Sequence, residues 1–158
     1  MGGKATPGAV LERMAAADMG EVQMGKLAQS NGSARTQEYG RMLEQDHAQS
    51  LQQVKDLGQK KGIAIADMPK DGMAKHEMRE AQEMKTKMSA MHGGAFDKAF
   101  AGMMVEDHQK DIDHLKAWRG TVGDKDVAAL IDQTLPVLQR HLSAAKNLRI
   151  PAAQGRTP

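Results

Sequence analysis

Residues able to do chemistry occur in the middle of two segments that resemble each other. Residues 42–47 read Met-Leu-Glu-Gln-Asp-His, and residues 103–108 read Met-Met-Val-Glu-Asp-His. Each segment ends in an Asp-His pair on the side of a helix that its apolar residues predict to be buried. A carboxylate and an imidazole on a buried face cost free energy unless they are paired or bound to a metal ion. The two pairs are Asp46-His47 and Asp107-His108.

Further ligand candidates lie at helical spacing around the two pairs. Glu44 precedes His47 by three residues, and Asp111 follows His108 by three, so each couple shares one side of a helix. The inner faces of the first and last helices each add one more candidate. The pattern predicts a site for a transition metal ion (iron, manganese, zinc or copper), built from some of Glu21, Glu44, Asp46, His47, Asp107, His108, Asp111 and His141.

Two other interpretations of these residues stay open. The Asp-His pairs are also typical of hydrogen-bonded core pairs that bind nothing. General acid-base catalysis without a metal is the third interpretation, although the sequence indicates no nucleophile and no catalytic residue.

A second group of candidates lies in and around the segment between the two long hairpins. The chain holds 13 methionines, and several of them gather here with two histidines. Thioether and imidazole groups together suit copper(I), whereas methionines at helical spacing also fill cores without binding anything. The residues of this predicted copper site are Met73, His76, Met84, Met88, Met91 and His92.

The composition favours helices as the elements that position these residues. Aromatic residues make up only 3% of the chain, and the good helix formers Ala, Met, Leu, Gln, Lys and Glu dominate. Apolar residues recur at steps of three and four, broken at Asn-Gly, Asp-Gly and Gly-Gly. Helices are predicted over residues 8–30, 34–61, 72–91, 95–119 and 125–148.

Connection lengths predict the topology. Short turns make the first two helices one antiparallel hairpin and the last two another, and a long crossover with a short helix joins them. This arrangement is the ferritin-like four-helix bundle, which places His47, His108 and Asp111 within about one turn of one another. We expect a disordered or trimmed start over residues 1–7, one bundle over 8–148 and a frayed tail over 149–158.

Charge and composition exclude several classes of protein. The formal net charge is only +2 with no long basic run, so we expect no nucleic-acid partner. The chain has no cysteine, which excludes disulfides and thiolate metal sites. No apolar stretch approaches the roughly 20 residues of a membrane span. Residues 1–8 also lack the apolar region of a signal peptide.

The chain resembles the exported bacterial proteins grouped as domain of unknown function 4142. The resemblance rests on residues 20–28, 42–47, 93–97, 104–111 and 135–142 and covers residues 8–148. It implies a ferritin-like helical domain, a periplasmic location and a signal peptide that this chain has lost. The usual polar positions of the family match Glu21, Asp46, His47, Asp107, His108, Asp111 and His141.

The pattern departs from the di-iron ferritins, which place Glu-x-x-His on two helices. Glu44 and His47 fit that motif, but Leu138 stands three residues before His141. We therefore expect a periplasmic metal-binding protein for metal handling or stress protection rather than an enzyme. A di-metal redox enzyme and a metal-free envelope protein that contacts other proteins are the alternatives. The exposed helical faces are also compatible with a homo-oligomer.

Overall fold

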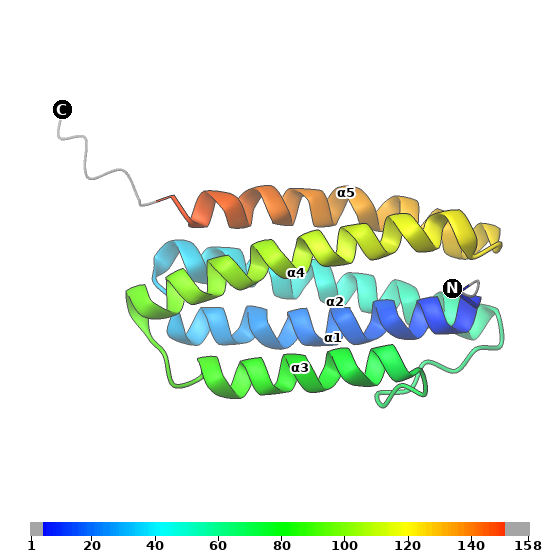
Figure 1. The fold of residues 1–158 in the computed structure, drawn as a ribbon, viewed down its shortest axis with the longest axis horizontal. Coiled ribbons are helices and arrows are strands. Elements are labelled where there is room, and N and C mark those ends of the chain that lie inside the picture. The colour runs from blue at the N-terminus through cyan, green and yellow to red at the C-terminus, as the bar shows by residue number, and fades with distance from the viewer. Residues whose placement is uncertain (1–4, 151–158) are drawn as a thin grey trace.

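A computed structural model of the protein describes residues 5–150, and within them the chain is all-α (Figure 1). The predicted all-α class is confirmed, and the predicted helix bounds differ from the observed ones by three residues at most. No strand occurs in the described part of the chain. The five helices are α1 (Pro7–Asn31), α2 (Ala34–Lys60), α3 (Gly72–Met88), α4 (Gly93–Thr121) and α5 (Lys125–Leu148).

Side-chain caps mark where three of the helices begin. The Thr6 hydroxyl accepts a hydrogen bond from the Ala9 amide at 3.2 Å, and Pro7 occupies the first turn, so α1 begins one residue earlier than expected. The Asp71 carboxylate caps α3, and the Asp124 carboxylate caps α5. Residues 1–4 and 151–158, most of the two predicted terminal segments, lie outside the described residues.

Two antiparallel hairpins form the body of the molecule. Figure 1 shows α1 and α2 side by side with opposite directions, and α4 and α5 likewise. Helix α2 ends at the opposite end from the start of α4, so α2 and α4 run parallel and α3 returns the chain along the bundle. Since α2 also contacts α5 and α1 contacts α4, the four long helices enclose a common core.

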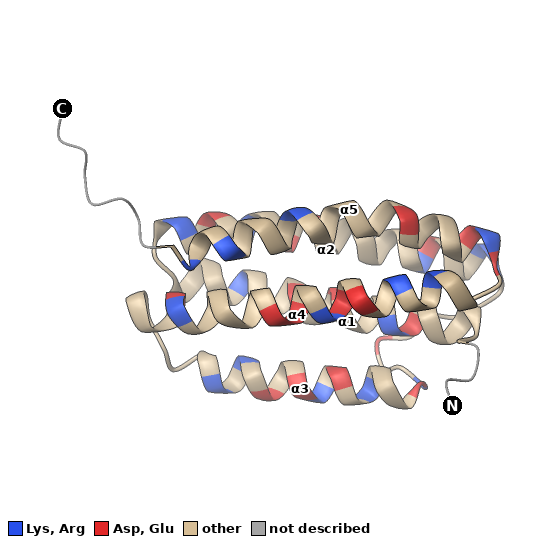
Figure 2. Ribbon diagram, turned by 45° about the horizontal axis from the view of Figure 1, so that its top comes forward, with Lys and Arg blue, Asp and Glu red and all other residues tan. Residues whose placement is uncertain are grey.

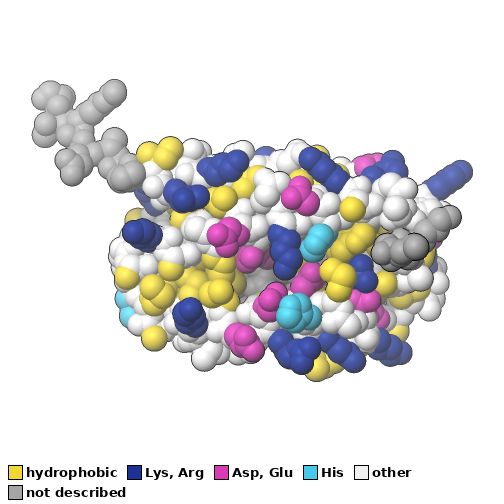
Figure 3. All heavy atoms as spheres, viewed as in Figure 1, with side chains coloured by type: hydrophobic (Ala, Val, Ile, Leu, Met, Phe, Trp, Pro, Cys, Tyr) yellow, Lys and Arg dark blue, Asp and Glu magenta, His cyan; other side chains and the backbone are white. Residues whose placement is uncertain are grey.

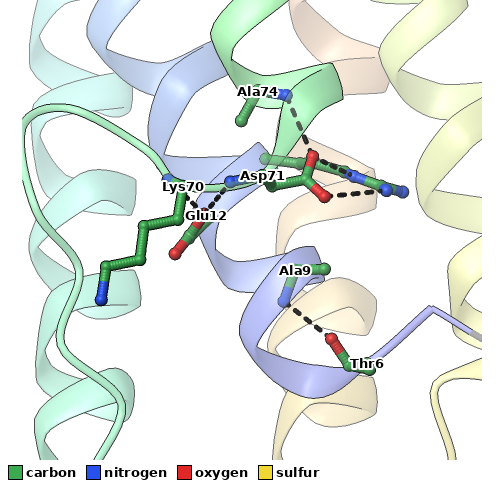
Figure 4. Close-up of polar contacts among 7 residues, drawn as sticks. Thr6, Ala9, Glu12, Lys70, Asp71 and Ala74 are labelled. Atoms are coloured by element: carbon green, nitrogen blue, oxygen red, sulfur yellow. Dashed lines mark hydrogen bonds and ion pairs between the residues drawn. The ribbon is translucent and has the colours of Figure 1, made fainter.

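Helix α3 lies along α1, to which both of its ends are hydrogen-bonded. At the start, the Glu12 carboxylate accepts from the Lys70 and Asp71 amides at 2.9 and 2.7 Å (Figure 4). Arg13 pairs with Asp71 at 2.9 Å. At the other end, the Asn31 side-chain amide donates to two carbonyl oxygens that follow α3, at 3.1 and 2.8 Å.

Helices α1 and α2 approach closely where two glycines face each other. A methyl group on Gly25 would lie 2.7 Å from the Gly40 carbonyl oxygen, and one on Gly40 would lie 2.6 Å from the Gly25 carbonyl oxygen. Only a residue without a side chain permits this contact between backbones. The contact fixes how α1 and α2 lie against each other in the part of the hairpin near the turn that joins them.

The core consists of two apolar clusters separated by a polar layer. One cluster, around Leu11, Val54 and Ile131, fills the end of the bundle where α1 begins. The other, around Phe96 and Phe100, fills the opposite end. Five buried polar residues lie between the two clusters: Asp18, Glu21, His47, His108 and His141. Among the described helices, none is both long enough and apolar enough to cross a membrane.

Candidate metal centre

Three buried imidazoles meet in the polar layer, each from a different helix. His47 comes from α2, His108 from α4 and His141 from α5, with exposed fractions of 3%, 0% and 0%. One nitrogen from each ring lies within 4.8 Å of the nitrogens of the other two, and no other such cluster occurs among residues 5–150. Three imidazoles at this separation could hold a metal ion.

Each of the three rings uses its other nitrogen to bond an acceptor outside the cluster. His47 Nδ1 lies 2.7 Å from an Asp18 oxygen, and His141 Nε2 lies 2.8 Å from an Asp46 oxygen. His108 Nδ1 lies 2.9 Å from the backbone carbonyl oxygen of Met104. A carbonyl and an ionised carboxylate only accept hydrogen bonds, so the ring proton of each neutral imidazole belongs on the outward nitrogen.

The inward nitrogens are therefore three lone pairs without a proton between them. His108 Nε2 and His141 Nδ1 lie 3.3 Å apart, yet both are acceptors once the outward bonds are made. If the proton of His141 were on the inward Nδ1 instead, Nε2 would be an acceptor facing the Asp46 carboxylate, which is also an acceptor. His47 Nε2 is buried and has no partner at all. A buried acceptor without a donor costs about 1–3 kcal/mol, so the cluster lacks a partner that a hydrogen-bond donor or a metal cation could supply.

The 3.3 Å separation also fits metal coordination. Two nitrogens that each lie about 2.0–2.1 Å from a tetrahedral ion are about 3.3 Å apart. Outward bonds to carboxylates and carbonyls are the usual supports of metal-binding histidines, because they fix the tautomer and the ring orientation.

Electrostatics keep two of the imidazoles uncharged. Burial, together with repulsion from His47 and His141, lowers the pKa of His108 to about 3. Burial also lowers the pKa of His141, although its bond to Asp46 opposes that effect. Near neutral pH these two rings are therefore unprotonated, which is the form that binds metal ions.

Asp18 was missed by the sequence analysis, although it holds His47 in place. The residue is 4% exposed, and its Oδ2 atom has no hydrogen-bond partner. Burial raises its pKa, against the opposing effect of His47. The signal was present, because Asp18 lies four residues after Met14 and three before Glu21 on the same side of α1.

The predicted acidic candidates take different positions around the histidines. A Glu21 oxygen lies 4.0 Å from His108 Nδ1, while its Oε2 is buried without a partner. Burial, reinforced by Asp111 and Asp107, raises the pKa of Glu21 well above its usual value. Asp107 and Asp111 are half-buried on α4 and lie outside the cluster of three imidazoles. Their role as ligands stays a prediction.

The two acidic residues of the α2 motif face opposite neighbours. Glu44 accepts a hydrogen bond from the Gln29 side chain of α1 at 2.6 Å. Asp46 instead reaches α5 and supports His141. The structure thus brings His47, His108 and His141 together, with Asp46 as a support, and leaves Glu44 bonded elsewhere.

The methionine-rich segment is spread over both sides of α3. Met73 and Met84 are 41% and 38% exposed, whereas Met88 is buried in the core and Met91 packs against it. His76 lies 3.2 Å from Glu80 on the exposed side, and His92 stands immediately before α4. The copper site stays a prediction.

Comparison with known proteins assigns the chain to a family. The family described as "Domain of unknown function (DUF4142)" matches residues 2–148, which is nearly the whole chain. The protein therefore belongs to this family, and the resemblance noted in the sequence is confirmed. No curated protein matches the chain, and no solved structure matches it.

Proposed function

We propose that this member of the DUF4142 family binds one transition metal ion through His47, His108 and His141, and that its role is metal handling or stress protection. One observation carries the proposal. Each imidazole is bonded outward to an acceptor, so that three lone pairs face one another in a buried space. A metal cation is the partner that satisfies all three at once.

The donor set favours certain ions. Imidazole nitrogens suit zinc, copper and iron, whereas manganese prefers oxygen ligands. Three protein ligands leave a further position for water or another small ligand. Support for one ion rather than two comes from Glu44, whose carboxylate is bonded to Gln29, and from the single cluster found among the described residues.

The ferritin-like classification and the periplasmic location belong to the same proposal. The two antiparallel hairpins and the long crossover support the first. The resemblance to exported bacterial proteins supports the second. In that compartment a buried site of neutral imidazoles would take up a divalent ion from the surrounding solution and withhold it from other reactions.

Thermal unfolding with and without metal tests the proposal. Protein purified without chelator is first analysed for bound metal, then melted with zinc, copper, iron(II), cobalt(II) and manganese. At one hundred times Kd, the bound ion should add about 2.7 kcal/mol to the free energy of unfolding. His47→Ala and His108→Ala should lose this gain. His76→Ala, which removes an exposed histidine of α3, should keep it.

A different outcome would support the core-pair interpretation. In that case no metal would move the wild-type melting curve. The two alanine variants would then be less stable than wild type at every metal concentration, because buried polar partners are left unpaired.

A further inference from the structure

Two cavities on different faces of the bundle reach His47. One, of about 30 Å³, lies among all five helices and is lined by Asp18, Glu77 and Asp111. The other, of about 150 Å³, lies between α2 and α5. His47 and Ser50 line both. The buried centre therefore has two routes to solvent.

The smaller cavity, called here the acidic cavity, collects carboxylates from three helices. Asp18 comes from α1, Glu77 from α3 and Asp111 from α4. Figure 3 shows acidic side chains around a hollow midway along this face, between α4 and α3. Figure 2 shows acidic residues at the same level on both helices. Exposure decreases inward, from half-buried Glu77 and Asp111 to Asp18 at 4%.

An unpartnered carboxylate oxygen lies at the inner end of this cavity. Asp18 lines it, and Asp18 Oδ2 is buried without a hydrogen-bond partner, while Oδ1 of the same carboxylate bonds His47. Ser50 also lines the cavity, and its buried hydroxyl lies close enough to Asp18 to lower the pKa of that carboxylate. Carboxylate and hydroxyl oxygens are ligands for a divalent cation.

One positively charged residue, Arg13, lines this cavity, but its guanidinium is already engaged. Arg13 makes two hydrogen bonds to Asp71 and lies over the Trp118 ring, at 5.4 Å from its centroid. Lys110 pairs with Glu80 at 3.8 Å. Burial, together with repulsion from Glu77, raises the pKa of Asp111 to about 8. Near neutral pH Asp111 is therefore mostly protonated, so that a proton rather than a cationic side chain neutralises it.

The other cavity has the opposite character. Its lining includes Gln49, Gln53, Gln133 and Arg140, and its acidic residue, Asp46, is already bonded to His141. Amide groups and a guanidinium do not attract a divalent cation. Of the two cavities, only the acidic cavity brings three carboxylates together on the way to His47.

We propose that the acidic cavity takes up divalent cations from solvent and delivers them to the three histidines, with Asp18 as the last carboxylate on the route. This step rests on the proposed function. The carboxylates of the cavity form no cluster of three within ligand distance among the described residues, so the cation passes through and does not stay. Asp18 connects the route to the centre through its two carboxylate oxygens. Oδ1 bonds His47, whereas Oδ2 has no hydrogen-bond partner and can contact a cation in the cavity.

The test measures how fast cobalt(II) reaches the histidines of the full chain. Stopped-flow absorbance follows the visible bands of cobalt(II) bound to imidazole. In the double variant Glu77→Gln/Asp111→Asn, measured above pH 8 where Asp111 is ionised, we expect association to slow about tenfold, since electrostatic attraction in a cleft raises association rates by about 10–1,000-fold. The spectrum and the amount bound should stay the same, and dissociation into excess chelator should not accelerate. The wild-type rate should fall more steeply with salt than the variant rate.

Two control variants accompany this test, and the first of them matches the loss of two carboxylates. Glu83→Gln/Asp113→Asn removes two exposed carboxylates from the same helices and should leave the rate within about twofold of wild type, by the loss of long-range attraction alone. Arg140→Gln, at the other cavity, should also leave it within that range, and a large acceleration would move the route to that side.

Three results would overturn the proposal while leaving the metal centre intact. The first is an unchanged association rate in Glu77→Gln/Asp111→Asn. The second is an altered spectrum or faster dissociation, which would make Asp111 or Glu77 a ligand. The third is the loss of a second bound cobalt, which would make the cavity a resident site. Absence of any cobalt uptake by wild type would instead refute the proposed function itself.

Discussion

Replacing Asp18 by asparagine tests the contribution of this residue to metal affinity separately from its contribution to the stability of the fold. Asparagine keeps the size of the side chain and still accepts a hydrogen bond from His47 Nδ1, but it removes the negative charge. Groups that support a ligand in this way are worth about 10–100-fold in metal affinity, which is about 1.4–2.7 kcal/mol. We expect this loss of affinity in Asp18→Asn.

The expected shift in stability follows from the affinity. At a metal concentration one hundred times the wild-type Kd, the wild type gains about 2.7 kcal/mol, and the variant gains about 0.4–1.4 kcal/mol. For a chain of this size, 1 kcal/mol corresponds to about 2–4 °C in Tm. The wild-type Tm should therefore rise by about 5–11 °C with metal, and that of the variant by about 1–6 °C.

Without metal the same variant should be at least as stable as wild type. Burial raises the pKa of Asp18, which means that the charged form is disfavoured in the folded state. Calorimetry gives the affinity by competition with a chelator, and thermal melts give the stability. Asp113→Asn, an exposed residue of α4, is the control. Unchanged affinity in Asp18→Asn would refute the claim that Asp18 supports a ligand.

The remaining predictions concern packing, pH and copper. Gly25→Ala should destabilise the protein by about 1–3 kcal/mol in urea unfolding because its methyl group meets the α2 backbone, whereas Gly102→Ala, with open space around it, should stabilise by about 0.5–1 kcal/mol; equal effects would contradict the close approach. Because burial raises the pKa of Asp111 to about 8, the folded state binds its proton more tightly than the unfolded state does. The metal-free protein should therefore lose stability as pH rises from about 4 through 8. In chelator-treated melts between pH 7 and 8, Asp111→Asn should reduce the loss of stability with rising pH. An unchanged dependence of stability on pH would contradict the assignment of this effect to Asp111. Replacing Met84, Met88 and Met91 by leucine should abolish copper(I) binding, and each such replacement usually lowers the free energy of unfolding by less than about 1.5 kcal/mol. An unchanged copper titration would show that these methionines only fill space.

The sequence predicted the helices and the common level of His47 and His108, because both depend on periodicity. Apolar residues at steps of three and four fix the buried side of each helix, and short turns fix its neighbours. His47, His108 and His141 each lie on the buried side of a long helix, which is why they could be found without a structure.

The partners of these histidines could not be predicted in the same way. Glu44 and Asp46 lie on either side of His47 around α2, and which neighbouring helix each one meets depends on how the helices are arranged. The spacing of Asp18 indicates that it lies on the buried side of α1 but not which histidine it contacts, and no spacing rule identifies the Met104 carbonyl as a support. The contacts of residues at the boundary between two helices therefore depend on how the helices pack and cannot be derived from the spacing in the sequence.

The origin of the three histidines in different hairpins has a consequence for the order of folding. His108 and His141 are 33 residues apart and belong to one hairpin, so this pair can form as soon as α4 and α5 meet. His47 belongs to the other hairpin and arrives only when the two halves dock. A metal ion would complete its ligand set after the slowest, most long-range step. It should therefore slow unfolding much more than it accelerates folding.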